Sequence, residues 1–310
     1  MSAVLALPET ESRADWLAQR RTGIGGSDVA AILGLSKWRT PLDVYLRKRG
    51  EGSEQPDNPA MYWGRALEPV VLAAYADETG HDVRRPEKII VHPTIPYLIA
   101  SLDGFTDEPR IVEVKTARSG NGWGEPGSAD VPDDYALQVQ HYMAVTGFPV
   151  ADIPVLIGGS DFRIYTVPAD VELQAAMIER CAEFWQRVMD GNPPDPVSYA
   201  DAVQRFGRSA GAGTVTADEA TRTAYVDLCA IREQTKALEA QEAECKAFIA
   251  KALADKGDTL VDSTGRTLAT WKLAKGAERF DSTAFKAAHP QLAAEFIKTG
   301  EPSRRMLIKD

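Results

Sequence analysis

Two acidic residues and a lysine lie close together in stretches rich in β-branched residues. Asp103 belongs to the segment SLDG, and Glu113 and Lys115 belong to IVEVKTA. Valine would pack better in a strand of this kind, so charged side chains there call for a chemical explanation. Carboxylates bind hard divalent cations, and a neighbouring ammonium can orient water and balance the charge on a phosphate. The residue types therefore indicate metal-assisted phosphodiester hydrolysis.

A hairpin would bring the two carboxylates together. If residues 110–117 form a strand, Glu113 and Lys115 share one face and the β-branched residues between them take the other. A three-residue connection, 107–109, then pairs Asp103 directly opposite Glu113, at about 5 Å. Two ionised carboxylates at that distance repel each other unless one is protonated or a cation joins them. We therefore predict a Mg²⁺ site in which Mn²⁺ can substitute.

The residues alone leave a simpler interpretation open. Glu113 and Lys115 would also suit a solvated ion pair on an exposed strand face. Asp103 would also suit a turn before Gly104. An isolated pattern of this length arises often by accident, so the surrounding motifs have to decide between the two interpretations.

The glycine-rich segment GIGGSD predicts an anion site at the start of a helix. It lacks the GK[ST] ending of a P-loop and the spacing of a dinucleotide fingerprint, which excludes ATP and NAD sites there. Ser27 is predicted to cap a helix that starts at Asp28, and the basic residues Arg20 and Arg21 lie just before it. Together these groups would bind one phosphate, although a plain capped helix with surface arginines also fits.

Charge is distributed unevenly along the chain. The formal net charge of −10 argues against a protein coated in nucleic acid. Residues 1–50 are nevertheless basic, and an acidic protein with a basic sector can hold DNA in one groove. Lys37 and Arg39 would extend the DNA path. Trp38 between them is expected to pack in the core, with stacking on an unpaired base as the alternative.

Periodicity predicts helices, then a small sheet, then helices. Helical patterns cover 28–34, 41–50, 61–80, 133–147 and 170–190. Short β-rich segments cover 88–93, 97–106, 110–117 and two strands within 150–168. This order predicts an α/β sandwich.

The chain is predicted to divide into a core at 1–203, a linker at 204–216 and a C-terminal region at 217–310. From Ala224 to Ala252, residues at alternating steps of three and four form the seam of a coiled coil or a long helical hairpin, followed by a small strand pair. The three cysteines fit neither a disulfide framework nor a metal site. Without a signal peptide or a membrane-spanning stretch, we expect a location in the bacterial host cytoplasm and no membrane partner.

Five ordered motifs carry a resemblance to a known family. Asp103 followed by Glu113-Val114-Lys115 resembles the PD-(D/E)xK nuclease signature, with Leu102 in place of the first proline. The order RRTGIGGSD, WGRALEP, SLDG, EVK and YALQVQHYM resembles the YqaJ-like viral recombinases, relatives of phage lambda exonuclease, over roughly residues 13–190. The resemblance implies a restriction-endonuclease-like core, a small mixed sheet flanked by helices, here with a mainly helical C-terminal appendage.

The resemblance also implies roles for individual residues. The implied metal ligands are Asp103, Glu113, the Val114 carbonyl and Glu68 of WGRALEP. Lys115 would be the catalytic lysine, and Gln138 would orient the nucleophile or the substrate. Arg21 and Ser27 match the arginine and serine that hold the 5′ phosphate. Taken from the residues alone, Glu68 would equally suit a solvated rim, and Gln138 would suit core packing beside Tyr135 and Tyr142.

The implied function is a Mg²⁺-dependent 5′-to-3′ exonuclease that degrades one strand of linear double-stranded DNA. It would supply single strands to an annealing recombinase in phage-type recombination. Relatives form ring trimers, so a homo-oligomer is implied, but the appended region leaves its form open. Two alternatives remain: an endonuclease of the restriction or defence type, and a non-catalytic scaffold that binds DNA ends.

Overall fold

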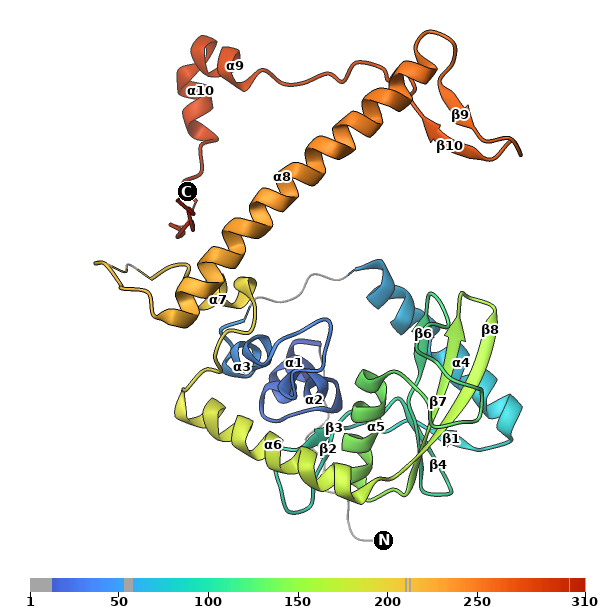
Figure 1. The fold of residues 1–310 in the computed structure, drawn as a ribbon. Helices are drawn as coiled ribbons and strands as arrows, with labels where there is room; N and C mark the ends of the chain where they lie inside the picture. Colours follow the sequence, from blue (N-terminus) through green and yellow to red (C-terminus); the bar gives the residue numbers. More distant parts are fainter. Residues whose placement is uncertain (1–12, 53–57, 210, 212, 301, 310) are drawn as a thin grey trace. The chain divides into compact units, whose positions relative to one another are not determined.

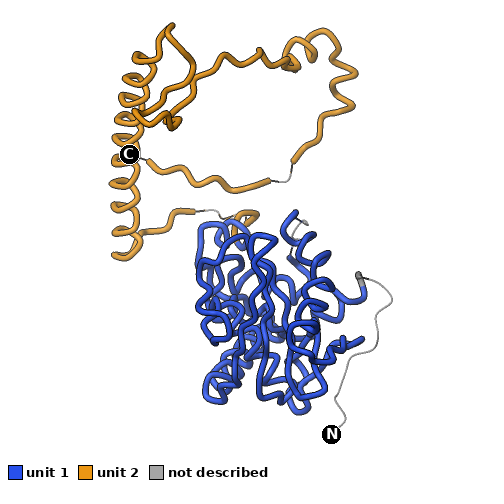
Figure 2. The backbone as a smooth tube through the Cα atoms, turned by 90° about the vertical axis from the view of Figure 1, so that its right-hand side faces the viewer, with its two compact units in different colours: residues 1–205 blue, residues 206–310 orange. Residues whose placement is uncertain are grey.

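The computed structural model describes residues 13–52, 58–209, 211, 213–300 and 302–309 (Figure 1). The chain divides into two compact units, residues 1–205 and residues 206–310 (Figure 2). Each unit is described by itself. No helix in the described ranges combines the length and the apolar character that a membrane span requires.

A mixed sheet of six strands forms the centre of unit 1. β1 and β4 pair antiparallel, as do β4 and β5; β5 and β6 both run parallel to β7, and β8 pairs antiparallel with β7. Two further strands, β2 and β3, form a separate antiparallel pair. The bounds are β1 (Val83–Arg84), β2 (Ile90–Val91), β3 (Ile99–Ala100), β4 (Gly104–Thr106), β5 (Arg110–Val112), β6 (Lys115–Ala117), β7 (Val150–Ile157) and β8 (Asp161–Pro168).

Helices cover both faces of this sheet, as expected for an α/β core. The helices up to residue 206 are α1 (Arg13–Arg21), α2 (Gly26–Ile32), α3 (Pro41–Arg49), α4 (Pro59–Thr79), α5 (Asp133–Thr146), α6 (Val171–Asp190) and α7 (Tyr199–Phe206). α3 and α4 end where the sequence predicts, because Gly50 and Gly80 adopt left-handed backbone with φ of 71° and 72°. The predicted fold class, a small mixed sheet flanked by helices with a mainly helical C-terminal region, is confirmed.

The β5 and β6 segments form one continuous line beside β7. Val112 lies opposite Asp152 and Lys115 lies opposite Val155, so both segments keep the same register. The Glu113 N–H donates to the Asp152 carbonyl at 2.9 Å between them. The strand alternation predicted for residues 110–117 therefore continues without a shift across residues 113 and 114, which lie between β5 and β6.

The two faces of this line pack against different helices. Val112 and Val114 are buried in a cluster with Val71, Leu72 and Tyr75 of α4. Ile111 belongs instead to the larger cluster that contains the apolar residues of α2, α5 and α6. Glu113 and Lys115 lie two and four residues after Ile111, so their side chains point to the same face of the sheet, toward α5.

Unit 2 is built around one long helix. α8 (Glu219–Leu253) has 35 residues, and it is followed by β9 (Thr259–Val261), β10 (Thr267–Thr270), α9 (Ser282–Ala288) and α10 (Pro290–Glu295). β9 and β10 pair antiparallel, as predicted for the small strand pair. Because 219–253 forms a single helix, the helical-hairpin interpretation of the seam is wrong. The seam residues from Ala224 to Ala252 are exposed within this unit.

Candidate active site

The ends of β4 and β5 place Asp103 beside Glu113. Gly104 pairs with Val112, and the same register sets Asp103 opposite Glu113 one position further along. The Val114 N–H donates to Asp103 Oδ2 at 2.9 Å, which holds the aspartate against the neighbouring strand. The pairing that the three-residue connection predicts is confirmed.

Glu113, Lys115 and Gln138 form one buried hydrogen-bonded group. The Lys115 ammonium donates to Glu113 Oε1 and, at 3.2 Å, to Gln138 Oε1. Gln138 Nε2 donates to Glu113 Oε1 at 2.6 Å and to the Tyr142 hydroxyl at 3.0 Å. Lys115 Nζ also lies 4.9 Å from the centre of the Tyr135 ring. Lys115 and Glu113 are therefore not a solvated surface pair, since Glu113 is only 3% exposed.

The electrostatics of this group suit a divalent cation. Burial and the nearby Asp103 raise the pKa of Glu113 to about 8, although Lys115 opposes the shift. Burial also raises the pKa of Asp103. Glu113 Oε2 is buried and accepts no hydrogen bond within the described part of the chain. An unpartnered carboxylate oxygen beside a second carboxylate is the donor set that Mg²⁺ takes, so these residues fit a metal ion.

Glu68 does not join these carboxylates. Its carboxylate forms an ion pair with Arg85, which follows β1. Across the described ranges, no group of three acidic, histidine or cysteine side chains is arranged to hold a metal. Arg85 supplies the opposite charge that Glu68 was expected to obtain from the metal. The ligand roles of Glu68 and of the Val114 carbonyl stay predictions.

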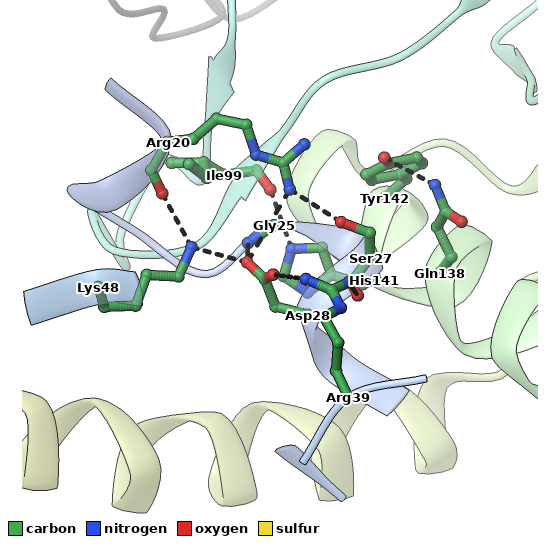
Figure 3. A network of polar contacts seen from close by, with 10 residues as sticks. All are labelled: Arg20, Gly25, Ser27, Asp28, Arg39, Lys48, Ile99, Gln138, His141 and Tyr142. Carbon is green, nitrogen blue, oxygen red and sulfur yellow. Dashed lines mark hydrogen bonds and ion pairs between the residues drawn. The ribbon is translucent and has the colours of Figure 1, made fainter. Parts of the chain in front are cut away.

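A second polar cluster is centred on Asp28 of α2 (Figure 3). Lys48 Nζ lies 2.7 Å from Asp28 Oδ2, and Arg39 Nη1 lies 3.2 Å from Oδ1. Arg20 Nη2 donates to the Ser27 hydroxyl at 2.8 Å and lies 3.9 Å from Asp28. Burial works against the ionised carboxylate, but the three cations hold the pKa of Asp28 well below its usual range. Three positive charges around one negative charge leave a net charge of two, which suits a phosphate.

One detail of the predicted phosphate site, the N-cap, is corrected by the structure. Gly25, rather than Ser27, is the N-cap of α2, and its N–H donates to Asp28 Oδ2 at 3.1 Å. Ser27 lies inside the first turn, where its hydroxyl accepts from Arg20. The structure brings Arg20 to Ser27, whereas Arg21 is exposed with its guanidinium near Gly50.

Two groups of side chains meet where α2 packs on α5. The cluster around Asp28, called the basic cluster below, consists of Arg20, Ser27, Asp28, Arg39 and Lys48. The carboxylate site consists of Asp103, Glu113, Lys115 and Gln138. A Cβ placed on Gly26 would lie 2.6 Å from the Tyr142 ring and 2.9 Å from the Gln138 carbonyl oxygen. Only glycine permits so close an approach. The helix that carries Ser27 therefore rests directly on the turn of α5 that carries Gln138.

Several of these residues were not predicted as parts of the site. Asp28 lies within the GIGGSD motif, but its partner Lys48 and the Glu68 partner Arg85 come from distant segments, and no local pattern reveals such tertiary pairs. The sequence does indicate a contact between Tyr142 and Gln138, because Tyr142 lies four residues after Gln138 on the same helix face. The expected core packing of Trp38 is wrong, since its side chain is 82% exposed.

Comparisons with known proteins agree with the motifs. Residues 15–149 match the YqaJ-like viral recombinase domain. The protein YqaJ of Bacillus subtilis (strain 168) is 32% identical over 316 residues, which cover 99% of this chain and 97% of that protein.

Solved structures are also similar in part. An alkaline exonuclease from Laribacter hongkongensis aligns with a TM-score of 0.48 and 24% identity, over 58% of this chain and 94% of that chain. A phage-related exonuclease from Haemophilus somnus 129PT aligns with a TM-score of 0.42 and 13% identity, over 55% of this chain and 96% of that chain. The sequence relationship with YqaJ extends over nearly the whole of both chains. The chain belongs to the YqaJ-like viral recombinase family.

Proposed function

We propose that this protein is a Mg²⁺-dependent nuclease that degrades one strand of linear double-stranded DNA from its 5′ end. The observation that carries the proposal is the buried group of Asp103, Glu113, Lys115 and Gln138, in which Glu113 Oε2 has no hydrogen-bond partner among the described residues. Membership of a recombinase family supports DNA as the substrate. Single strands produced in this way would serve an annealing recombinase.

Each residue of the group has a chemical task in hydrolysis. Asp103 and Glu113 would hold the divalent cation, which when bound neutralises phosphate charge and activates water. The Lys115 ammonium would stabilise the negative charge that develops on the attacked phosphate. Gln138 fixes Lys115 and Glu113 relative to each other through its amide. Mn²⁺ has the same preference for oxygen ligands and would substitute.

The basic cluster supports recognition of a 5′ phosphate. Arg20 and Ser27 are already hydrogen bonded to each other, and Arg39 donates to the Ser27 carbonyl. A phosphate would replace these mutual contacts with charge-assisted hydrogen bonds. Binding the terminal phosphate here, beside the carboxylate site, would set a 5′-to-3′ direction. Arg20 takes the role that the resemblance implies for Arg21.

A digestion of end-labelled linear DNA tests the proposal. With Mg²⁺ we expect release of the 5′ label as mononucleotides, with no release in EDTA or from Lys115→Ala. A covalently closed circle should remain intact. Cutting of the circle would favour the endonuclease alternative, and binding of ends without hydrolysis would favour the scaffold.

The exposed seam of α8 supports a homo-oligomer. The residues at alternating steps of three and four include Leu228, Ile231, Leu238 and Ile249, all exposed within unit 2. A helix with such a seam gains stability when another helix covers it. We propose that copies of this chain pair through α8. The trimer implied by the resemblance is one form this assembly could take.

A further inference from the structure

The Tyr142 hydroxyl occupies the boundary between the basic cluster and the carboxylate site. Tyr142 is 3% exposed and lies one turn after Gln138 on α5. Figure 3 shows its hydroxyl beside the Gln138 amide, on the side that faces Arg20 and Ser27. The proposed function assigns this tyrosine no role.

On one side the hydroxyl orients the Gln138 amide. Gln138 Nε2 has two protons, one donated to Glu113 and one to the Tyr142 oxygen, at 2.6 Å and 3.0 Å. Gln138 Oε1 is thereby turned toward Lys115, from which it accepts. An amide in the opposite orientation would place its NH₂ group against the ammonium. Tyr142 thus completes the set of contacts that fixes the amide.

On the other side the hydroxyl faces the predicted phosphate site. Arg20, Gly25, Ser101 and Tyr142 line a narrow hollow there, which is too tight for a water molecule until a side chain moves. Within the described residues, the hydroxyl accepts one hydrogen bond and no donated bond is found. A hydroxyl carries one donor, so its proton is available to a phosphate oxygen that enters when the contact between Arg20 and Ser27 opens.

Close packing keeps the hydroxyl in this position. The ring lies against Gly26, where a Cβ would approach its Cε1 to 2.6 Å. The ring therefore cannot turn away without displacing the segment that carries Ser27. Tyr142 is thus held against Gly26 of α2 while it is hydrogen bonded to Gln138 of α5.

We propose that Tyr142 recognises the terminal phosphate. Its hydroxyl donates a hydrogen bond to a 5′-phosphate oxygen bound by Arg20 and Ser27, and at the same time accepts one from Gln138. A filled phosphate site then favours the Gln138 orientation that hydrolysis requires. The inference rests on the proposed function and adds to it a residue that determines specificity for 5′-monophosphate ends.

The test compares Tyr142→Phe with the unaltered full-length protein on two duplexes that differ only in a 5′ phosphate or a 5′ hydroxyl. The ratio of kcat on the phosphorylated duplex to kcat on the hydroxyl duplex should fall roughly fivefold to tenfold, the usual effect of one lost hydrogen bond. KM for the phosphorylated duplex should change little, because Arg20 and Ser27 remain. Ser27→Ala should instead raise that KM.

A matched control separates this role from ordinary packing. Tyr75→Phe also removes a buried hydroxyl, one that donates to Asp152 at 2.6 Å on the α4 side. It should lower the melting temperature and leave the kcat ratio unchanged. Thermal unfolding of Tyr142→Phe, compared with the unaltered protein, establishes that the variant is folded before the kcat ratio is read.

The outcomes are distinguishable. An unchanged kcat ratio in the folded variant, or an equal loss on both duplexes, would overturn the role of Tyr142 alone. Failure of the unaltered protein to hydrolyse either duplex with Mg²⁺ would instead overturn the proposed function.

Discussion

Ionised Glu113 carries a cost that a bound cation would remove. Among the described residues one of its oxygens is buried without a hydrogen-bond partner, and Asp103 stands beside it. We predict that Glu113→Gln abolishes hydrolysis yet raises stability in EDTA by about 1 kcal/mol, because the amide carries no charge and can donate to Asp103. Thermal unfolding measures the change. Mg²⁺ should raise the melting temperature of the unaltered protein but not that of Glu113→Gln.

The control for that experiment lies on the same hairpin. Glu108→Gln makes the same chemical change at an exposed position between β4 and β5. It should keep both the activity and the Mg²⁺-induced shift. If Glu113→Gln still gained stability from Mg²⁺, Glu113 would not be a ligand.

His141 makes the stability of unit 1 sensitive to acid. It is 2% exposed, its Nε2 donates to the Ile99 carbonyl at 3.0 Å, and burial lowers its pKa to about 4. The unfolded chain, with an ordinary histidine pKa of about 6.5, binds the proton more readily. The contribution of neutral His141 is therefore complete above pH 6.5 and is lost as the pH falls toward 4, by about 3 kcal/mol in all.

His141→Gln tests this linkage because glutamine can donate to the same carbonyl without titrating. Urea unfolding at a series of pH values between 7 and 4 should show a smaller loss of stability than in the unaltered protein. Identical losses in both proteins would show that His141 is not the group responsible.

At the scale of elements, the connection between α2 and α3 presents Trp38 to solvent. Arg39 is anchored to Asp28 and the Ser27 carbonyl, so the exposed indole stands beside the basic cluster. Trp38→Ala should weaken binding to frayed DNA ends about tenfold, the order expected for one lost stacked base, with little change in melting temperature.

Fluorescence anisotropy with frayed and blunt duplexes measures that effect. Trp271→Ala removes another exposed tryptophan, in unit 2, and should leave both affinities unchanged. Equal weakening on frayed and blunt ends would argue against stacking of Trp38 on an unpaired base.

The elements that the sequence predicts well are those specified by local chemistry. Glycines at the ends of α3 and α4, and the short turn between β4 and β5, act over a few residues. The pairing of Asp103 with Glu113 follows from that turn and from strand alternation. The two carboxylates and Lys115 were found in this way and Gln138 through the family resemblance, and the structure brings all four side chains to one place.

The rest of the site depends on contacts between distant segments. Arg85 reaches Glu68 only because β1 lies near α4, and Lys48 reaches Asp28 from a separate helix. The choice between Arg20 and Arg21 depends on how α1 is rotated, since successive helical residues point about 100° apart. None of these relations has a signature in the local sequence.

At the scale of the whole molecule, the proposed pairing of copies through α8 can be tested by mutation. A charge at a seam position should prevent helix pairing, so Leu238→Glu should lower the mass of the assembly in solution. Sedimentation equilibrium measures that mass. Ala240→Glu adds the same charge away from the seam and should leave it unchanged. A monomeric unaltered protein would contradict pairing through α8.

The turn between β4 and β5 has a consequence for how the chain tolerates insertions. Its three residues, 107–109, set which β4 side chain faces Glu113. One added residue that slipped the pairing by one position would exchange Asp103 for Leu102 at that place and turn the aspartate toward the opposite face. Such a protein would keep every residue of the proposed site but no longer bring the two carboxylates together, so the proposed chemistry depends on the length of this connection as well as on the residues.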